Sequence, residues 1–125
     1  MEIKEQLLGN WTSVMETYEF YEENGSKIHP DQISSDINYK LEIGPNTIKA
    51  VEVGESPVES EYEFHQDLLD CYLVVFVGTE TQIQKIKLFG NNLIMISEVD
   101  DMRYQQDGVW KTAYKSIYSI EFSRN

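Results

Sequence analysis

The chain has 125 residues, and its 22 acidic residues outnumber its ten basic residues to give a formal net charge of −12. This length predicts a single domain, residues 1–125, and the many aromatic residues (eight Tyr, five Phe and two Trp) exclude a disordered chain and favour β-strands. The negative field disfavours nucleic acid and anionic membranes as partners and favours a basic protein or a cationic ligand, unless the acidity serves solubility alone.

Cysteine content and the first residues bear on the compartment. Cys71 is the only cysteine, so no internal disulfide can form, and its apolar run CYLVVFV indicates a buried small side chain rather than a nucleophile. The start MEIKEQLL is too charged for a signal peptide, and no run approaches the roughly 20 apolar residues that span a bilayer. We therefore expect a cytoplasmic protein; a signal peptide removed ahead of Met1 would make it periplasmic.

The first elements are a helical turn and a long strand. Ile3, Leu7 and Leu8 have a spacing that predicts one or two helical turns, which Gly9 ends. The following run, WTSVMETYEFY, is β-prone, and the Asn-Gly pair at residues 24–25 predicts a turn after it.

The next segment, Ser26–Asp36, has the least regular pattern in the chain. Pro30 excludes a central strand there, because proline cannot donate to a β-ladder. We expect a lid or an Ω-loop, and a short helix beginning at Asp31 is the alternative.

From residue 37 onward the pattern is a series of strands joined by short turns. The expected strands are INYKLEI, TIKAVEV, VESEYEFH, CYLVVFV, TQIQKIKLF, LIMISEV, MRYQQDGVW (interrupted by a turn at Asp107-Gly108) and KTAYKSIYSIEF. The apolar run CYLVVFV predicts cover on both faces. The clearest alternation places Val58, Ser60, Tyr62 and Phe64 on one face and Glu59, Glu61, Glu63 and His65 on the other; the last run places Tyr114, Ser116, Tyr118, Ile120 and Phe122 together. An antiparallel meander of eight to ten strands must pack as a sandwich or close on itself.

Gly9 and Trp11 stand between the helical turn and the first long strand. This Gly-x-Trp opening, followed by a β-meander, resembles that of the lipocalin and calycin families, most closely the small bacterial lipocalin-like domains. The resemblance implies an all-β fold, an antiparallel up-and-down β-barrel with a short N-terminal helix. It also implies that Trp11 plugs one end of the barrel, that Gly9 allows the tight turn, and that Arg124 packs over the Trp11 ring.

No pattern in the sequence indicates a reaction, so we expect no enzyme, no cofactor and no metal. His29 and His65 are the only histidines, and neither a Cys/His cluster nor a Ser–His–Asp set or a phosphate loop can be assigned. The aspartates at positions 67, 70, 100 and 101 sit at expected turns, where backbone geometry accounts for them, with a weak calcium site as the alternative.

Polar residues within the apolar faces indicate where a ligand could bind. Glu16 shares its face with aromatic neighbours, and the candidate ligand-binding residues are Glu16, Tyr62, Tyr114 and Tyr118. Tyrosine hydroxyls and one carboxylate would suit an amphipathic or cationic ligand. The competing interpretation, which we favour for so small a barrel with so many large side chains, is a filled interior with the hydroxyls directed to the rim.

Two functions follow as hypotheses. The favoured one is a non-catalytic acidic protein that neutralises a basic protein partner such as a toxin or effector enzyme, in the manner of bacterial immunity proteins. Its candidate interface residues are Glu59, Glu61, Glu63, Glu52, Glu55, Asp100 and Asp101. The alternative interpretation of the row Glu59, Glu61 and Glu63 is a solvated strand face whose charges only prevent pairing with other strand edges. The second function is a lipocalin-like carrier of a small hydrophobic or amphipathic ligand, which an empty interior of a few hundred Å³ would favour.

Overall fold

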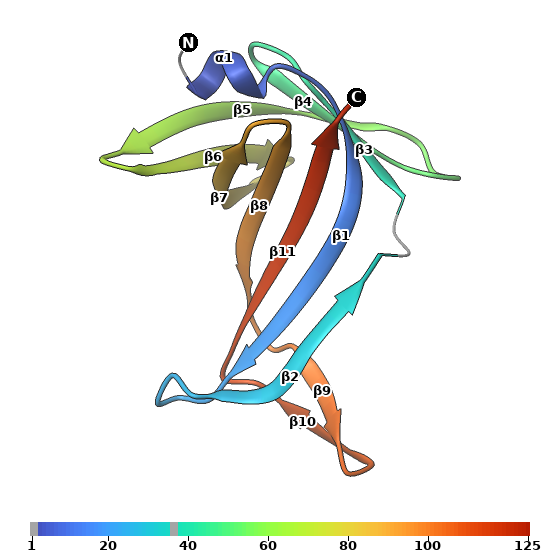
Figure 1. Cartoon of the computed structure of the whole chain (residues 1–125), viewed down its shortest axis with the longest axis vertical. Helices are drawn as coiled ribbons and strands as arrows, with labels where there is room; N and C mark the ends of the chain where they lie inside the picture. The colour runs from blue at the N-terminus through green and yellow to red at the C-terminus, as the bar shows by residue number, and fades with distance from the viewer. Residues whose placement is uncertain (1–2, 36–37) are drawn as a thin grey trace.

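A computed structural model describes residues 3–35 and 38–125, and within these residues a short helix precedes a series of antiparallel strands (Figure 1). The elements are α1 (Ile3–Leu7), β1 (Gly9–Tyr21), β2 (Lys27–Ser34), β3 (Tyr39–Ile43), β4 (Thr47–Glu52), β5 (Val58–Asp67), β6 (Asp70–Val77), β7 (Glu80–Phe89), β8 (Asn92–Val99), β9 (Arg103–Gln106), β10 (Val109–Thr112) and β11 (Lys115–Arg124). Eight of these strands close into a barrel in the order β1-β3-β4-β5-β6-β7-β8-β11, with β11 pairing back to β1. The expected antiparallel barrel with a short N-terminal helix is confirmed.

The long strands β1 and β11 extend beyond the barrel. Their pairing runs from Trp11 opposite Arg124 to Tyr21 opposite Lys115, with a bulge between Ser13 and Met15. On its other side β1 pairs with β3 near the barrel end that carries α1, and with β2 over its second half. The bulge lies between the part of β1 that pairs with β3 and the part that pairs with β2. A bulge bends a strand and increases its twist, so it allows β1 to leave one partner and join the other.

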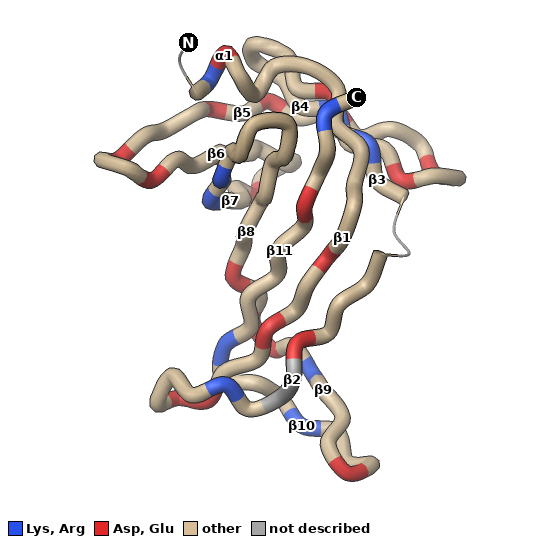
Figure 2. The backbone as a smooth tube through the Cα atoms, viewed as in Figure 1, with Lys and Arg blue, Asp and Glu red and all other residues tan. Residues whose placement is uncertain are grey.

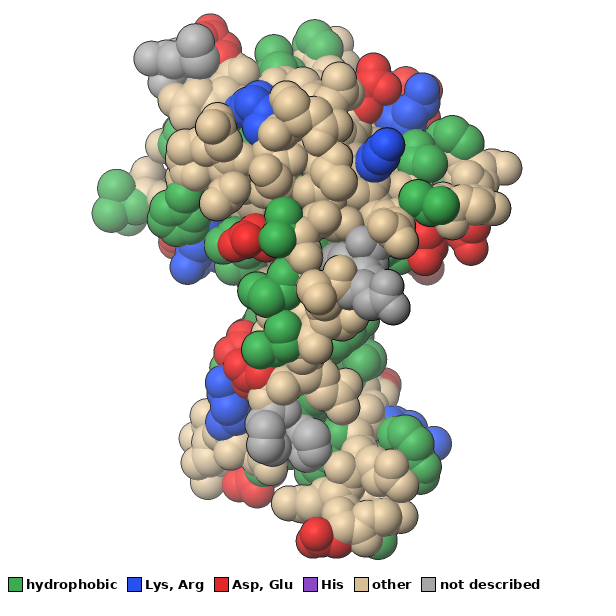
Figure 3. Space-filling model, turned by 45° about the vertical axis from the view of Figure 1, so that its right-hand side comes forward, with side chains coloured by type: hydrophobic (Ala, Val, Ile, Leu, Met, Phe, Trp, Pro, Cys, Tyr) green, Lys and Arg blue, Asp and Glu red, His purple; other side chains and the backbone are tan. Residues whose placement is uncertain are grey.

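The second half of β1 and the first half of β11, which pair with each other, support a smaller lobe. This lobe contains β2 and the β9–β10 hairpin. Acidic residues occur both in this lobe and in the barrel (Figure 2). A separate apolar cluster of Phe20, Tyr104 and Ala113 forms its core, and a narrow waist separates the two lobes (Figure 3). The Asp107-Gly108 turn predicted from the sequence joins β9 to β10.

The segment Ser26–Asp36 is not the irregular loop that the sequence predicted. Lys27–Ser34 forms β2, Asp31 begins no helix, and Asp36 and Ile37 lie outside the described residues. A proline can be accommodated in β2 because this strand lies at the edge of the sheet and pairs only with β1. In addition, the β1–β2 pairing shifts its register between Tyr18 and Phe20, opposite the part of β2 that contains residue 30. Proline in a sheet is confined to such edges and bulges.

The prediction that CYLVVFV is covered on both faces is wrong. Cys71, Leu73 and Val75 are buried inside the barrel, whereas Phe76 on the outer face is 37% exposed. The physical reason is that β6 lies in the wall of a single closed sheet, and the second sheet found among the described residues is the β9–β10 hairpin of the smaller lobe (Figure 1). The predicted burial of Cys71 is confirmed, and this burial raises the pKa of its thiol.

The end of the barrel beneath α1 is closed by Trp11. The ring is fully buried, its Nε1 donates to the Leu7 carbonyl at 2.9 Å, and the Arg124 guanidinium lies 4.2 Å from the ring centroid. Arg124 also donates to the carbonyls of Leu8, at 3.0 Å, and Gln6. Gly9 has a φ of +130°, and a Cβ there would lie 3.2 Å from Arg124 Nη1, so glycine suits both the backbone and the space. The contact expected between Arg124 and Trp11 is present.

Candidate functional site

The interior of the barrel holds a cavity of about 440 Å³. Its lining comes from seven of the eight barrel strands: Tyr39, Leu41, Ile48, Ala50, Val58, Ser60, Val75, Val77, Gln82, Gln84, Met95, Tyr118, Ile120 and Phe122. Val58 and Gln82 are exposed and mark its open side, whereas Phe122 and Leu41 are buried toward the end closed by Trp11. The expectation of a filled interior is wrong. Small residues such as Ala50 and Ser60 line the wall, and bulky rings pack instead beneath α1 and in the smaller lobe.

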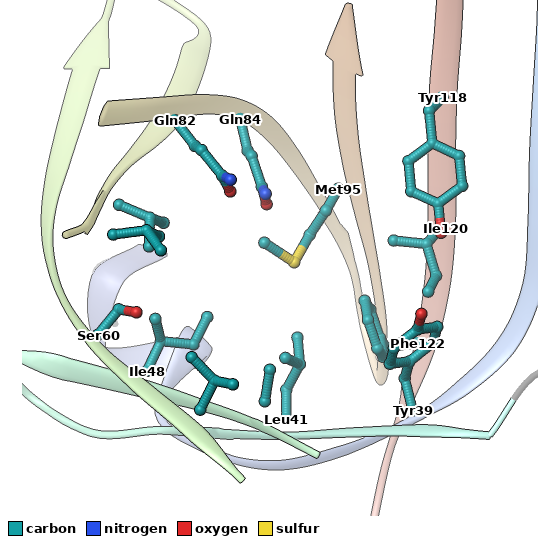
Figure 4. Close-up of a pocket in the computed structure, with 14 residues that line it drawn as sticks. Tyr39, Leu41, Ile48, Ser60, Gln82, Gln84, Met95, Tyr118, Ile120 and Phe122 are labelled. Atoms are coloured by element: carbon teal, nitrogen blue, oxygen red, sulfur yellow. The ribbon is translucent and has the colours of Figure 1, made fainter. Parts of the chain in front are cut away.

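The cavity combines an apolar floor with a few polar groups (Figure 4). Ile48, Met95 and Phe122 supply apolar surface, while the side chains of Gln82 and Gln84 extend from β7 into the same space (Figure 4). A mostly apolar lining with a small number of oriented polar groups is the usual composition of a small-molecule site.

A hydrogen bond joins Tyr118, which lines the cavity, to Glu16. The Tyr118 hydroxyl donates to Glu16 Oε2 at 2.9 Å, and the Tyr18 ring packs against the Tyr118 ring with centroids 4.7 Å apart. Burial, followed by the hydrogen bond to Glu16, raises the pKa of Tyr118 far above the ordinary value of 10.0. The phenol therefore stays protonated at neutral pH and holds the half-buried carboxylate in place.

Tyr39 lines the cavity from the first position of β3. Its backbone N–H donates to Ser13 Oγ at 2.9 Å, and Tyr39 stands directly opposite Glu52 in the β3–β4 ladder. Burial raises the pKa of the Tyr39 phenol, and the neighbouring carboxylates of Glu52, Glu16 and Glu55 raise it further. Negative charge therefore gathers on the tyrosine side of the cavity.

The structure brings together only part of the ligand set expected from the sequence. Glu16 and Tyr118 are in contact, but Tyr62 is buried elsewhere and donates to the Gly44 carbonyl at 2.6 Å. Tyr114 precedes β11, is 65% exposed and does not line the cavity, so its expected place on the inner face of the last strand is wrong. Its backbone N–H donates to the Tyr21 carbonyl, which places it at the junction with the smaller lobe.

Sequence reasoning missed Gln82, Gln84 and Tyr39 as cavity residues. A signal was present, because both glutamines share the parity of the buried Ile86 in β7, and Tyr39 shares that of Leu41 in β3. Amides at inward positions of a barrel strand indicate a polar wall rather than a dry core.

The acidic residues proposed as an interface are distributed over two regions. Glu59, Glu61 and Glu63 are exposed on the outer face of β5, where Lys49 lies opposite Glu59 and the Glu63 carboxylate contacts His65 Nε2 at 3.0 Å. Glu52 is the last residue of the neighbouring strand β4, and Glu55 lies in the turn that follows, where its N–H donates to the Glu52 carbonyl. Asp100 and Asp101 belong to the link between β8 and β9 near the waist, apart from β5 (Figure 1).

Two further observations concern metals and membranes. Among residues 3–35 and 38–125, no three His, Cys, Asp or Glu side chains gather as a metal site would require. In the same part of the chain, no helix is long and apolar enough to cross a bilayer.

The barrel is consistent with a calycin-like fold. Comparisons with protein-family models, curated proteins and solved structures found no match to this chain.

Proposed function

We propose that the protein is a lipocalin-type carrier that binds a small, mostly apolar ligand inside the barrel. The cavity of about 440 Å³ carries this proposal, because its volume falls within the range of roughly 300–1,000 Å³ that is typical of ligand pockets. A filled barrel would have favoured a function on the outer surface alone. The proposal involves no reaction.

Two features of the chain support a lipocalin-type assignment. Gly9 and Trp11 open the first barrel strand beneath a short helix, and Arg124 of the last strand covers the tryptophan. One end of the barrel is thereby sealed, so a ligand would enter from the side marked by Val58 and Gln82. A site closed at one end can withdraw an apolar molecule from water, which is the main driving force for binding it.

We expect the wild-type protein to bind the neutral apolar dye N-phenyl-1-naphthylamine and the variant Ala50→Phe to bind it at least about tenfold more weakly, a change of roughly 1.4 kcal/mol. Ala50 lines the cavity, so an added ring there occupies the space of the ligand. The measurement is a fluorescence titration of the dye.

The matched control is Val51→Phe, which adds a similar ring one residue further along β4, on the opposite face. This variant should bind the dye as the wild type does, and circular dichroism should show that both variants fold. Equal binding by Ala50→Phe and the wild type would place the dye outside the barrel. Failure of the wild type to bind would contradict the carrier function.

A second candidate function, the neutralisation of a basic protein, is supported by the exposed row Glu59, Glu61 and Glu63. These carboxylates point away from the barrel along one strand, and the chain as a whole has a net charge of −12. Such a face accelerates the capture of a cationic partner. It leaves the cavity free, so the two functions can be tested separately.

Replacing Glu59, Glu61 and Glu63 together with Gln is expected to lower the association rate with a basic partner and to flatten its dependence on salt. Exposed charges are screened beyond about 8 Å at physiological ionic strength, so the effect should be greatest at low salt. The measurement is surface plasmon resonance at several salt concentrations, starting with a basic secreted effector encoded by a neighbouring gene.

The control for net charge is a triple variant in the smaller lobe: Glu22→Gln, Glu23→Gln and Asp107→Asn. It also removes three negative charges, but from exposed positions outside β5. An equal loss of rate in both variants would show that total charge, and not the β5 face, attracts the partner.

A further inference from the structure

The tyrosine side of the cavity carries negative charge that no basic side chain at the cavity offsets. None of the 14 lining residues is charged, and none of the ion pairs found among residues 3–35 and 38–125 involves Glu16 or Glu52. Glu16 is half-buried and accepts a hydrogen bond from Tyr118, a neutral donor that does not compensate its charge. A half-buried carboxylate of this kind is stabilised by a nearby cation.

Aromatic faces stand beside these carboxylates. Tyr118 packs against Tyr18 at 4.7 Å between centroids, and Tyr39 lines the same side of the cavity as Tyr118 (Figure 4). Electron-rich tyrosine faces attract ammonium groups, and desolvation strengthens that attraction. The Tyr118 oxygen, which uses its proton in the bond to Glu16, can still accept a hydrogen bond from a ligand N–H.

The rest of the lining favours an apolar body. Leu41, Ile48 and Phe122 are buried around the floor, while Gln82 and Gln84 are neutral and stand on another wall. The cavity therefore has one apolar region and one acidic, aromatic region, and a ligand with the same division fits both.

We propose that the ligand is an amphipathic cation, an amine or quaternary ammonium on an apolar body, with its charged head beside Tyr39 and Tyr118 and with Glu16 and Glu52 as counter-ions. This inference rests on the proposed carrier function. An anionic amphiphile, such as a fatty acid, would bring its carboxylate next to Glu16 and is disfavoured. A primary ammonium head would donate to oxygen atoms, whereas a quaternary head would rely on the ring faces.

The test compares probes with the same chain and different heads. We expect isothermal titration calorimetry with the wild-type protein, below the micelle concentration, to give decylammonium or decyltrimethylammonium a dissociation constant at least about tenfold lower than that of decyl sulfate, with decanol between them. Raising the salt concentration should reduce this preference only partly, because Glu16 is half-buried.

Substitutions then test whether the preference for a cationic head group arises from the carboxylates beside the cavity. Glu16→Gln keeps an oxygen that can accept from Tyr118 and should reduce the preference for the cation several-fold; Glu52→Gln, on an exposed residue, provides a second variant should the first fail to fold. The matched control Glu61→Gln removes one charge from the outer face of β5 and should leave the preference unchanged.

The outcomes separate this inference from the carrier function. If the dye and all three kinds of decyl probe bind with no preference for the cation, or if decyl sulfate binds best, the cationic ligand is excluded and the carrier function stands. If Glu61→Gln reduces the preference as much as Glu16→Gln does, the preference arises from total charge and the proposed head site is wrong. If neither the dye nor any decyl probe binds, the carrier function itself fails.

Discussion

Replacing Trp11 with alanine is expected to lower the free energy of unfolding by about 3–5 kcal/mol, the usual cost of truncating a buried aromatic side chain. The ring is fully buried at the closed end of the barrel, its Nε1 hydrogen bond to the Leu7 carbonyl would be lost, and Arg124 would lose the surface over which it lies. This cost is a large share of the 5–15 kcal/mol that is typical of a domain. Urea denaturation followed by circular dichroism measures it.

The chain offers a matched control in its other tryptophan. Trp110 lies on β10 and is 58% exposed, and the Arg103 guanidinium lies 5.5 Å from its ring centroid. Trp110→Ala removes the same atoms from a surface site and should change the stability by no more than about 0.5–1 kcal/mol. Equal effects of the two substitutions would mean that Trp11 does not anchor the barrel.

Replacing Phe20 with alanine is expected to have an effect of similar size, about 3–4 kcal/mol, through the smaller lobe. Phe20 is fully buried, its ring centroid lies 5.4 Å from that of Tyr104, and this pair joins β1 to the β9–β10 hairpin. Because the cluster has few other buried members, its neighbours can make up little of the lost contact. Hydrogen exchange should show amides of β2, β9 and β10 losing protection before those of β3 to β7.

Phe89→Ala is the control for this second substitution, since Phe89 ends β7 and is mostly exposed. It should leave both stability and exchange within about 0.5 kcal/mol of the wild type. Uniform loss of protection in Phe20→Ala would instead show that the two lobes unfold as a single unit.

The alternation of apolar and polar residues along the chain predicted many of the strands, because residues two apart in a strand lie on the same face. The exposed glutamates of β5, the buried Tyr62 between them and the turn at Asp107-Gly108 all follow from patterns within a few residues. The contact between Arg124 and Trp11 came from a family resemblance, since no local pattern links positions so far apart.

The errors have a common physical origin in long-range packing. Pro30 is incompatible with a central strand but not with an edge strand, and β2 lies at the edge of the sheet because it pairs with β1 alone. Tyr114 fits the alternation of β11 yet precedes the strand, because the chain there leaves the β9–β10 hairpin. A filled interior was favoured over an empty one because the sequence provides only the sizes of the side chains. The volume left inside the barrel depends on where all the large side chains pack at once.

The pairing of β1 with β11 also constrains how the chain can fold as it is synthesised. Trp11 faces Arg124 across this ladder, so the barrel cannot close until nearly all of the 125 residues have left the ribosome. Until then β1 presents an unpaired edge to other nascent chains, and contacts between residues so distant in sequence form slowly. The half-made sheet is thus the form of this protein most exposed to aggregation, and a chaperone that shields β1 during translation would raise the yield of closed barrels.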